Sequence, residues 1–436
     1  MLTKIKILYY YLYYKYILKF KTRKELVSFQ KRKLRKHLNF VKNNSPFYKG
    51  FKRYKDYPKT NKNIMMDNFN LINTAGITKE EAEDFAISAE KTRIFSPKLK
   101  GITVGLSSGT SGKRGIFLVS DKEKTKWAGY ILSKFLDKGI LSSYKIAFFM
   151  RANSNLYESV SSRNIKFHFF DIYKDINDNI KSLEKLNPDI LVGQPSLLLM
   201  LAKAKDEGNL NINVRKIISI AEVLEEKDKE KIKKSFNLEK IDEVYQCTEG
   251  CLATTCKCGR LHLNEDIVHI KKKYLDESRF IPIITDFERK TQPIIKYELN
   301  DILIERKQRC ECGSVLTCIE KIEGRQDDVF IFLDENNNKK YIFPDFIRRC
   351  ILFIDTKNDN LEYRVIQDKD NLVTVFANLT EEEKTLVIKE FQKLANDNNV
   401  LLPKLNFKEY ETDKNKKLKR ISRERTLKNE QTNKKY

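Results

Sequence analysis

Short apolar runs alternate with longer polar stretches of helical character between residues 102 and 325, and this alternation restricts the fold more than any other feature of the sequence. The runs that predict strands span residues 102–106, 116–119, 146–150, 166–170, 190–192, 217–220 and 243–245. The stretches that predict helices span residues 121–137, 195–207 and 225–236. Strands that alternate with helices are typical of an α/β sheet, and we therefore predict an α/β fold.

The chain divides into three parts by the same patterns. Residues 1–100 are predicted to be largely helical and to form the N-terminal part of a large domain, and residues 101–326 to form its α/β core. Residues 327–436 predict a small α+β domain, with helices at 344–353 and 381–395 and strands at 363–366 and 372–377. A chain of 436 residues is long enough to bury more than one core, which agrees with this division.

The composition is that of a soluble protein with a basic excess. Charged residues make up 33% and hydrophobic residues 41% of the chain, and 84 Lys and Arg against 60 Asp and Glu give a net charge of +24. This charge favours anionic partners such as nucleotides, nucleic acid or an anionic membrane. Because a general bias toward lysine explains the excess as well as a binding patch does, we predict no specific nucleic-acid partner.

Residues 8–20 carry aromatic side chains on nearly every face of a predicted helix and have basic flanks. Tyrosine has an apolar ring and a polar tip, so this helix suits either packing on the protein body or contact with the inner face of a membrane. The sequence shows no cleavable signal and no run of about 18 apolar residues. We predict a cytoplasmic protein, with peripheral membrane contact through this Tyr-rich segment as the open alternative.

A loop rich in serine and glycine connects two predicted strands at residues 107–115. Glycine lets the backbone approach an anion closely, and backbone amides, hydroxyl groups and cations supply hydrogen-bond donors. The spacing differs from that of a Walker loop, and no helix follows directly. We predict that the loop binds phosphate through Ser107, Ser108, Gly109, Thr110, Ser111, Gly112 and Lys113.

Further polar groups follow apolar runs downstream. Thr248 and Glu249 come directly after the predicted strand at 243–245, and ligands bind at the carboxyl ends of strands in α/β sheets. A glutamate there suits a magnesium ion held against nucleotide phosphates. Asp301 ends a later apolar run, and Arg325 lies just before the small domain. A carboxylate suits two ribose hydroxyls, and an arginine reaches ribose or phosphate.

The order of these motifs resembles that of the adenylate-forming (ANL) superfamily: a Ser/Thr/Gly-rich loop, an aromatic-x-x-Thr-Glu turn, Tyr-x-x-x-Asp, Gly-Arg-x-Asp-Asp and a lysine near the C-terminus. Within it, the chain is most similar to the phenylacetate-CoA ligase and coenzyme F synthetase branch, and closest to uncharacterised adenylate-forming enzymes. This similarity rests on residues 105–112, 245–250, 261–266 and 285–287.

The resemblance implies an ATP- and Mg²⁺-dependent ligase that activates a small-molecule carboxylate as an acyl-adenylate and releases pyrophosphate, followed by transfer to an unknown thiol, amine or hydroxyl acceptor. It also implies a large domain of mixed sheets and helices and a mobile C-terminal domain with its hinge at Asp327. The Ser/Gly loop would hold the β- and γ-phosphates, and Glu249 would ligate magnesium with Thr248 lining the site. Adenosine and ribose would contact Ala221, Glu222, Tyr245, Asp301 and Arg325.

Lys417 best matches the family's lysine that bridges the carboxylate and the α-phosphate. The family motif opens with glycine, whereas Lys416 precedes Lys417 here, and Lys419 is the alternative. Residues 330–343 match poorly the loop that CoA ligases use beside the hinge, which argues against CoA as the acceptor.

Two other functions stay open. One is an adenylyltransferase that moves AMP onto a coenzyme hydroxyl, as the deazaflavin enzyme of this branch does. The other is a non-enzymatic, basic, zinc-containing protein that binds nucleic acid or an anionic polymer.

Two C-x-C-G elements lie about fifty residues apart in the second half of the chain. Pairs of thiolates followed by glycine suit tetrahedral zinc, and the resemblance adds comparable cysteine and histidine positions in related enzymes. We predict a structural zinc site, and which four residues bind stays open. The preferred set is Cys256, His262, Cys310 and Cys312, with Cys258 as the leading substitute.

Overall fold

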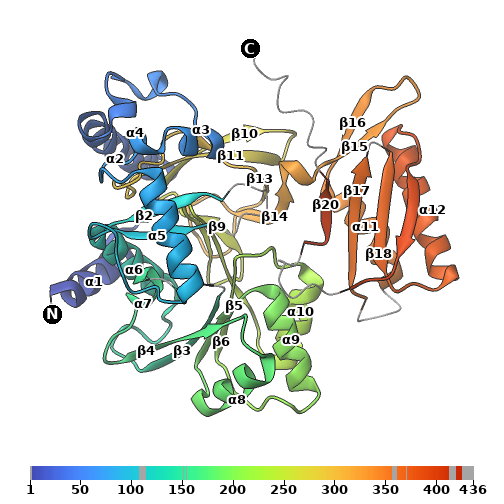
Figure 1. Cartoon of the computed structure of the whole chain (residues 1–436), viewed down its shortest axis with the longest axis horizontal. Helices are drawn as coiled ribbons and strands as arrows, with labels where there is room; N and C mark the ends of the chain where they lie inside the picture. Colours follow the sequence, from blue (N-terminus) through green and yellow to red (C-terminus); the bar gives the residue numbers. More distant parts are fainter. Residues whose placement is uncertain are drawn as a thin grey trace. The chain divides into compact units, whose positions relative to one another are not determined.

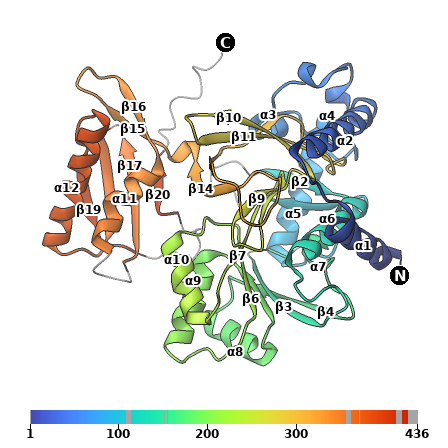
Figure 2. The ribbon, with the colours of Figure 1, turned by 180° about the vertical axis from the view of Figure 1, so that it is seen from behind.

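The computed structural model describes residues 2–107, 114–150, 152–153, 155–355, 361–369, 371–411 and 419–424. The chain forms two compact units: Met1–Leu299 with Leu303–Lys321, and Asn300–Ile302 with Ile322–Tyr436. Figures 1 and 2 show both units from opposite sides.

The large unit is built on a seven-stranded sheet of order β4-β3-β5-β6-β7-β8-β9. The first five strands of this order pair in parallel, and β8 and β9 continue the sheet antiparallel. The five strands that the apolar runs predict in this region are confirmed to within two residues. The bounds are β3 (Tyr144–Met150), β4 (Ile165–Asp171), β5 (Ile190–Gly193), β6 (Lys216–Ile220), β7 (Asp242–Cys247), β8 (Gly250–Thr255) and β9 (Leu261–Leu263).

Both faces of the sheet are buried, because successive side chains of a strand point to opposite faces. Ala147 and Phe149 of β3 pack with α8 (Ile176–Leu186), α9 (Pro195–Asp206) and α10 (Glu226–Phe236) on one face. Ile146 and Phe148 pack on the other face with α1 (Leu2–Leu12), α6 (Asp121–Phe135) and residues that follow α7 (Asn155–Glu158). Figure 1 shows the two helix layers.

Two smaller sheets complete this part of the fold. Strands β1 (Thr103–Leu106) and β2 (Ile116–Val119) form an antiparallel hairpin. A second sheet has the order β10-β11-β13-β14, with β12 paired to β11. The strand predictions do not include β8 to β14, and in β10 exposed lysines interrupt the apolar pattern. The strands of this second sheet are β10 (Val268–Tyr274), β11 (Arg279–Asp286), β12 (Tyr297–Glu298), β13 (Asp301–Glu305) and β14 (Ile319–Arg325).

The first hundred residues are largely helical, as predicted. After α1 come a π-helical turn (η1, Tyr13–Ile17), α2 (Arg23–Asn44), the 3₁₀ turns η2 (Pro46–Tyr48) and η3 (Tyr54–Asp56), α3 (Lys62–Asp67), α4 (Phe69–Ile72) and α5 (Lys79–Thr92). No helix in the described part of the chain is both long and apolar enough to cross a bilayer.

The second unit has the predicted α+β character. Its four-stranded sheet has the order β19-β18-β17-β20, and a separate hairpin joins β15 to β16. Phe330, Phe332, Ile351 and Phe391 are among the residues of its core. Its elements are η4 (Gln326–Asp328), β15 (Phe330–Leu333), β16 (Lys339–Ile342), α11 (Pro344–Asp355), β17 (Tyr363–Lys369), β18 (Leu372–Ala377), α12 (Glu381–Asn398), β19 (Lys404–Lys408) and β20 (Ile421–Arg423).

Helix α1 crosses α6 at Gly129, where the two backbones come close. A Cβ atom at Gly129 would lie 2.5 Å from Cβ of Tyr10 and 3.0 Å from both the Ile7 carbonyl oxygen and the Tyr11 amide nitrogen. Because two of these three atoms belong to the backbone, α1 has no side-chain movement that would make room. The packing of the first helix on the protein body therefore depends on this glycine.

We predict that Gly129→Ala destabilises the protein by about 1–3 kcal/mol, the usual cost of overpacking. At an uncrowded helix position, replacing glycine by alanine stabilises the protein by up to about 1 kcal/mol. The sign of the change in the free energy of unfolding is therefore the test. Chemical denaturation would measure the free energy of unfolding, with the exposed Asn39→Ala in α2 as the control. A stabilised Gly129→Ala variant would contradict the close contact.

Candidate active site

Two hydrogen bonds close the base of the Ser/Gly loop and extend the β1–β2 hairpin. The Ser107 amide donates to the Gly115 carbonyl oxygen at 2.7 Å, and the Gly115 amide donates to Ser107 Oγ at 2.7 Å. The predicted phosphate-binding residues from Ser108 to Lys113 lie outside the described residues. The hairpin therefore fixes where the loop starts and ends.

Arg114, the second cation of the loop, is held by neighbouring groups. Its Nε donates to the Ser107 carbonyl oxygen at 2.8 Å, and its two terminal nitrogens bind the Glu90 carboxylate of α5 at 2.5 and 2.6 Å. Hydrogen bonding to Glu90 raises the pKa of the guanidinium. Arg114 thus serves to tie the loop to α5.

Two predicted site segments and one further turn lie at the carboxyl ends of neighbouring parallel strands. Residues 194–196 follow β5, Ala221 and Glu222 follow β6, and Thr248 and Glu249 follow β7. Since β5, β6 and β7 pair side by side in parallel, these segments meet at one edge of the sheet. In open α/β sheets this edge is the ligand-binding edge.

Ala221 has a strained backbone at this edge. Its φ is +66°, and the Glu222 amide donates to the Ile220 carbonyl oxygen at 2.8 Å, which makes a tight three-residue turn. Glu222 Oε2 accepts from the Ser196 amide in the first turn of α9 at 3.3 Å. A non-glycine residue in the left-handed region costs about 1–3 kcal/mol and occurs preferentially at functional sites. Tyr245, only 8% exposed, lies on the adjacent strand.

Both carboxylate oxygens of Glu249 are engaged. Tyr297 Oη donates to Oε1 at 2.7 Å, and Thr248 Oγ1 donates to Oε2 at 2.8 Å. The following residue, Gly250, lies close to Asp286, because a Cβ there would be 2.9 Å from Oδ2 of Asp286 and would require that side chain to shift. Burial raises the pKa of Asp286 to about 7.

A small pocket joins the base of the loop to the Thr248–Glu249 turn. Its wall combines charged and polar groups of these two motifs with methionine and isoleucine side chains of α3 and β2. The lining residues are Lys62, Met65, Met66, Gly115, Ile116, Thr248, Glu249, Gln292, Ile294 and Tyr297. The structure therefore brings together two motifs that are more than 130 residues apart in the sequence.

Arg289 and Gln292 hold the two motifs together, and the sequence analysis missed both. Arg289 donates to the Thr248 carbonyl oxygen at 2.9 Å and to that of Leu118 in β2 at 3.3 Å. Gln292 donates to the Ile116 carbonyl oxygen at 3.0 Å and accepts from the Leu118 amide at 2.9 Å. No local sequence pattern predicts contacts between residues so far apart in the chain.

Glu123 of α6 positions the segment that carries these two residues. Its carboxylate accepts from the amides of Lys290 and Thr291 at 2.5 and 2.8 Å and from Thr291 Oγ1 at 2.5 Å. Glu123 also closes a capping box with Ser120 at the start of α6. The spacing Ser-x-x-Glu is visible in the sequence, and it was the signal that could have identified Glu123.

Asp301, Arg325 and Asp327 all belong to the second unit. Arg325 Nε lies 3.6 Å from Asp301 Oδ1, and Asn300 Nδ2 donates to Asp327 Oδ2 at 2.6 Å. The Gln326 amide also donates to the Asn300 carbonyl oxygen at 2.8 Å. The predicted ribose ligands form an ion pair, and hydrogen bonds of the neighbouring Asn300 hold the predicted hinge residue beside them.

Of the two candidate catalytic lysines, Lys417 and Lys419, only Lys419 is among the described residues. Lys417 lies outside the described residues. Lys419 Nζ forms an ion pair with Asp328 Oδ1 at 2.6 Å. Burial raises the pKa of Asp328, and the nearby Lys419 opposes this rise. Lys419 therefore has a structural partner within its own unit.

The preferred cysteine and histidine set forms one cluster. The ligand atoms of Cys256, His262, Cys310 and Cys312 all lie within 4.8 Å of one another. Cys256 Sγ and Cys310 Sγ are 3.7 Å apart, and Cys312 Sγ is 3.5 Å from His262 Nε2. Cys258, the substitute, is exposed and groups instead with Cys310 and Glu311.

Backbone groups shape the cluster on both sides. The amides of Cys258 and Ser314 donate to Cys256 Sγ and Cys312 Sγ at 3.4 Å each. Gly259 and Gly313 close the two turns with φ of +75° and +78°, a conformation that favours glycine. His262 Nδ1 hydrogen-bonds the Leu316 carbonyl oxygen at 3.1 Å, which leaves Nε2 directed at the cluster.

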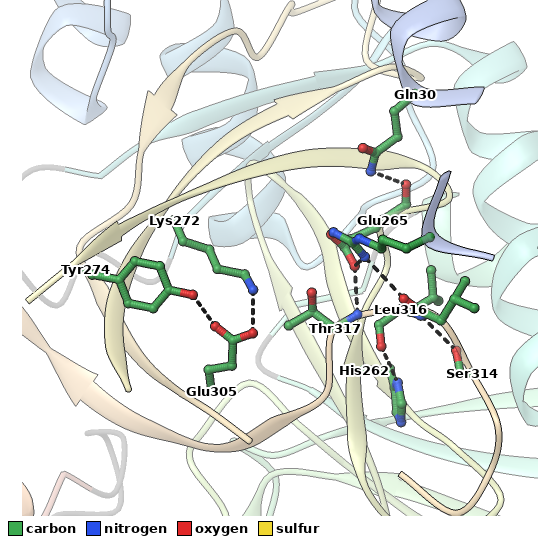
Figure 3. Close-up of polar contacts among 11 residues, drawn as sticks. Gln30, His262, Glu265, Lys272, Tyr274, Glu305, Ser314, Leu316 and Thr317 are labelled. Atoms are coloured by element: carbon green, nitrogen blue, oxygen red, sulfur yellow. Dashed lines mark hydrogen bonds and ion pairs between the residues drawn. The ribbon is translucent and has the colours of Figure 1, made fainter. Parts of the chain in front are cut away.

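The cluster loop is also tied to the N-terminal helix α2 (Figure 3). Glu265 accepts from the Thr317 amide at 2.7 Å and from Arg23 Nη1 at 2.5 Å, and Gln30 donates to the Glu265 carbonyl oxygen at 2.8 Å. The same Arg23 reaches the Val315 carbonyl oxygen at 3.2 Å. Glu265 therefore connects the loop after Cys312 to α2.

Comparison with known proteins shows similarity in structure alone. No protein-family model matches the sequence, and no curated protein matches it. The structure resembles 2-hydroxyisobutyryl-CoA ligase in the postadenylation state in complex with 2-HIB-AMP, with a TM-score of 0.66 and 14% identity over 90% of this chain and 88% of that chain. An open conformation of that ligase, in complex with 2-HIB-AMP and CoA, gives a TM-score of 0.59 at 15% identity over 89% of each chain.

A second ligase gives a weaker match. The anthranilate CoA ligase AuaEII in complex with anthranoyl-AMP matches with a TM-score of 0.50 and 11% identity over 71% of this chain and 64% of that chain. At sequence identities this low, the structural match shows that the chains share a fold. The chain therefore has the fold of the adenylate-forming ligases, and the predicted resemblance is confirmed at the level of the fold.

Proposed function

We propose that the protein is an ATP- and Mg²⁺-dependent adenylate-forming ligase that converts a small-molecule carboxylate to an acyl-adenylate with release of pyrophosphate. The observation that carries this proposal is the pocket shared by the base of the Ser/Gly loop and the Thr248–Glu249 turn. Attack on the α-phosphorus accumulates negative charge, and fixed amides, hydroxyls and cations lower the barrier.

Glu249 is the residue that we assign to the magnesium ion. Its carboxylate provides the hard oxygen ligand that Mg²⁺ prefers, and Tyr297 and Thr248 orient it. The ion supplies charge neutralisation of the phosphates when it is bound. Lys62, which lines the same pocket, adds a cation beside the loop base.

We assign the adenosine to the strained turn at Ala221 and Glu222 with Tyr245 nearby, and the ribose to Asp301 with Arg325. The hinge is assigned to Asp327. The motif order and the Cys/His cluster support the phenylacetate-CoA ligase and coenzyme F synthetase branch, and the acceptor is a thiol, amine or hydroxyl.

The Cys/His cluster fits a structural zinc ion. Tetrahedral zinc with Zn–S of about 2.3 Å and Zn–N of about 2.0 Å separates two sulfurs by about 3.8 Å and a sulfur from a nitrogen by about 3.5 Å. The separations of 3.7 and 3.5 Å agree with this geometry. Three thiolates and one imidazole leave no open position, so the ion would stabilise the fold and take no part in catalysis.

We predict that Glu249→Gln lowers ATP–pyrophosphate exchange at least about 100-fold, because it removes a charge that the transition state needs. The amide still accepts a hydrogen bond from Tyr297, so folding should be unaffected. Exchange would be measured with a panel of aliphatic, aromatic and amino acids, and Mg²⁺-dependent ATP binding by calorimetry. The neighbouring Glu298→Gln, outside the pocket, is the matched control.

Two outcomes would contradict this assignment. Equal magnesium dependence of ATP binding in Glu249→Gln and the native protein would remove Glu249 from the ion. Failure of every acid to release pyrophosphate, with AMP instead transferred from ATP to a hydroxyl acceptor, would favour the adenylyltransferase.

We predict that Lys417→Ala reduces adenylation at least about 100-fold while ATP affinity changes by less than about threefold, since the lysine contacts the charge that develops during the reaction. Lys419→Ala is the matched variant. It should retain adenylation but lose stability, because the buried Asp328 carboxylate loses its partner. The opposite result would assign the catalytic role to Lys419.

We predict about one zinc ion per chain in the purified protein, and its loss in Cys312→Ser together with a lower melting temperature. Elemental analysis and thermal unfolding before and after chelation would measure this. Cys350→Ser, a buried cysteine of the second unit, should keep the metal. A native protein that is fully folded without metal would rule out the structural role.

A further inference from the structure

The N-terminal segment presents an unusual number of apolar side chains to solvent. Of the 21 large apolar side chains that are exposed in the described residues, seven lie within residues 2–17. The most exposed are Leu2 at 73%, Ile17 at 67%, Tyr16 at 62% and Tyr9 at 59%. A concentration of this kind marks an interaction surface, whereas single exposed apolar residues are ordinary.

These side chains form a stripe along a helix that is firmly packed on its opposite side. Leu2, Ile5, Tyr9, Leu12 and Tyr16 follow the 3-4-3-4 spacing of one helix face. Ile7, Tyr11 and Tyr14 are buried against the body of the protein, and the crossing at Gly129 fixes α1 on α6. The exposed stripe is therefore a property of the folded protein.

Basic residues surround the stripe. With about 100° per residue, Lys4 and Lys6 project on either side of it, and both are exposed. Residues 1–55 contain thirteen Lys and four Arg against one Glu, which gives 17 − 1 = +16 of the +24 net charge. Helix α2 adds exposed cations at Lys31, Arg32, Arg35 and Lys36, and lies on the same side of the large unit as α1 in Figures 1 and 2.

We propose that α1 and η1 form a peripheral binding surface for an anionic lipid bilayer, with the helix lying in the plane of the headgroups. An amphipathic helix of this kind buries its apolar face about 5–10 Å into the interface, and basic residues within about 8 Å add attraction to anionic lipids. This inference goes beyond the proposed ligase activity and does not depend on it.

The charge pattern distinguishes among the binding partners that could cover an apolar stripe flanked by basic residues. A second copy of the chain would bring Lys4 and Lys6 of one protomer against the cations of its partner, and like charges repel. A nucleic acid or another polyanion would pair with the cations but leave the apolar stripe in water. An anionic bilayer satisfies both features at once.

The test is flotation of the full-length protein with vesicles of phosphatidylcholine alone or with about 30% phosphatidylglycerol. We expect binding to the anionic vesicles, and at least a tenfold loss of binding in Ile5→Glu/Leu12→Glu. A second variant, Lys4→Glu/Lys6→Glu, should lose binding and its salt dependence together. Leu141→Glu is the matched control, because Leu141 is 82% exposed in the same unit but outside the stripe, and it should bind like the native protein.

All these positions are exposed, so the variants should keep the native melting temperature. Vesicle binding that Ile5→Glu/Leu12→Glu leaves unchanged would overturn the proposal. Absence of vesicle binding would also overturn the proposal if the protein instead forms a concentration-dependent dimer that this variant abolishes. The same holds if the protein instead binds single-stranded DNA in a salt-sensitive way. Pyrophosphate exchange in solution should be the same in both N-terminal variants, which separates this surface from the catalytic site.

Discussion

The guanidinium of Arg289 connects two parts of the fold that share no strand pairing in the described residues. One end of it binds the carbonyl oxygen of Thr248, in the turn after the last parallel strand of the main sheet, and the other binds that of Leu118 in the β1–β2 hairpin. Hydrogen bonds to a charged group contribute about 1.5–3 kcal/mol each, more than neutral ones. The position of the β1–β2 hairpin, and so of the loop base at Gly115, relative to Thr248 depends in part on this bridge.

Further hydrogen bonds hold the segment that carries Arg289. Glu123 holds the backbone at residues 290 and 291, and Gln292 takes both a donor and an acceptor position on the backbone of β2. The terminal nitrogens of Arg289, the amide group of Gln292 and the carboxylate of Glu123 each have a partner of matching chemistry, whereas Nε of Arg289 has no hydrogen-bond partner among the described residues. Buried polar groups that are satisfied in this way specify one arrangement, because any displacement would leave a donor or acceptor unpaired.

Local patterns in the sequence predicted the parallel strands and main helices of the fold but not β8 to β14, nor the contacts that join the elements. Apolar runs located β3 to β7, and the position of Thr248 and Glu249 after β7 followed from them. Gln292 contacts residues 174 and 176 positions away, a distance at which neither periodicity nor turn chemistry carries information. The cysteine spacing, together with the family resemblance, predicted the Cys/His cluster for the opposite reason, since each C-x-C-G element is local and only the pairing of the two is not. Glu265, which ties the second element to α2, had no such signal.

Helix α6 links the proposed membrane surface to the proposed active site. Its first turn carries Glu123, which holds the segment of Arg289 and Gln292, and its middle carries Gly129, on which α1 packs. A helix transmits position along its length because its backbone hydrogen bonds fix every turn relative to the next. If α1 lies flat on a bilayer, α6 therefore sets the orientation of the pocket relative to the lipid surface.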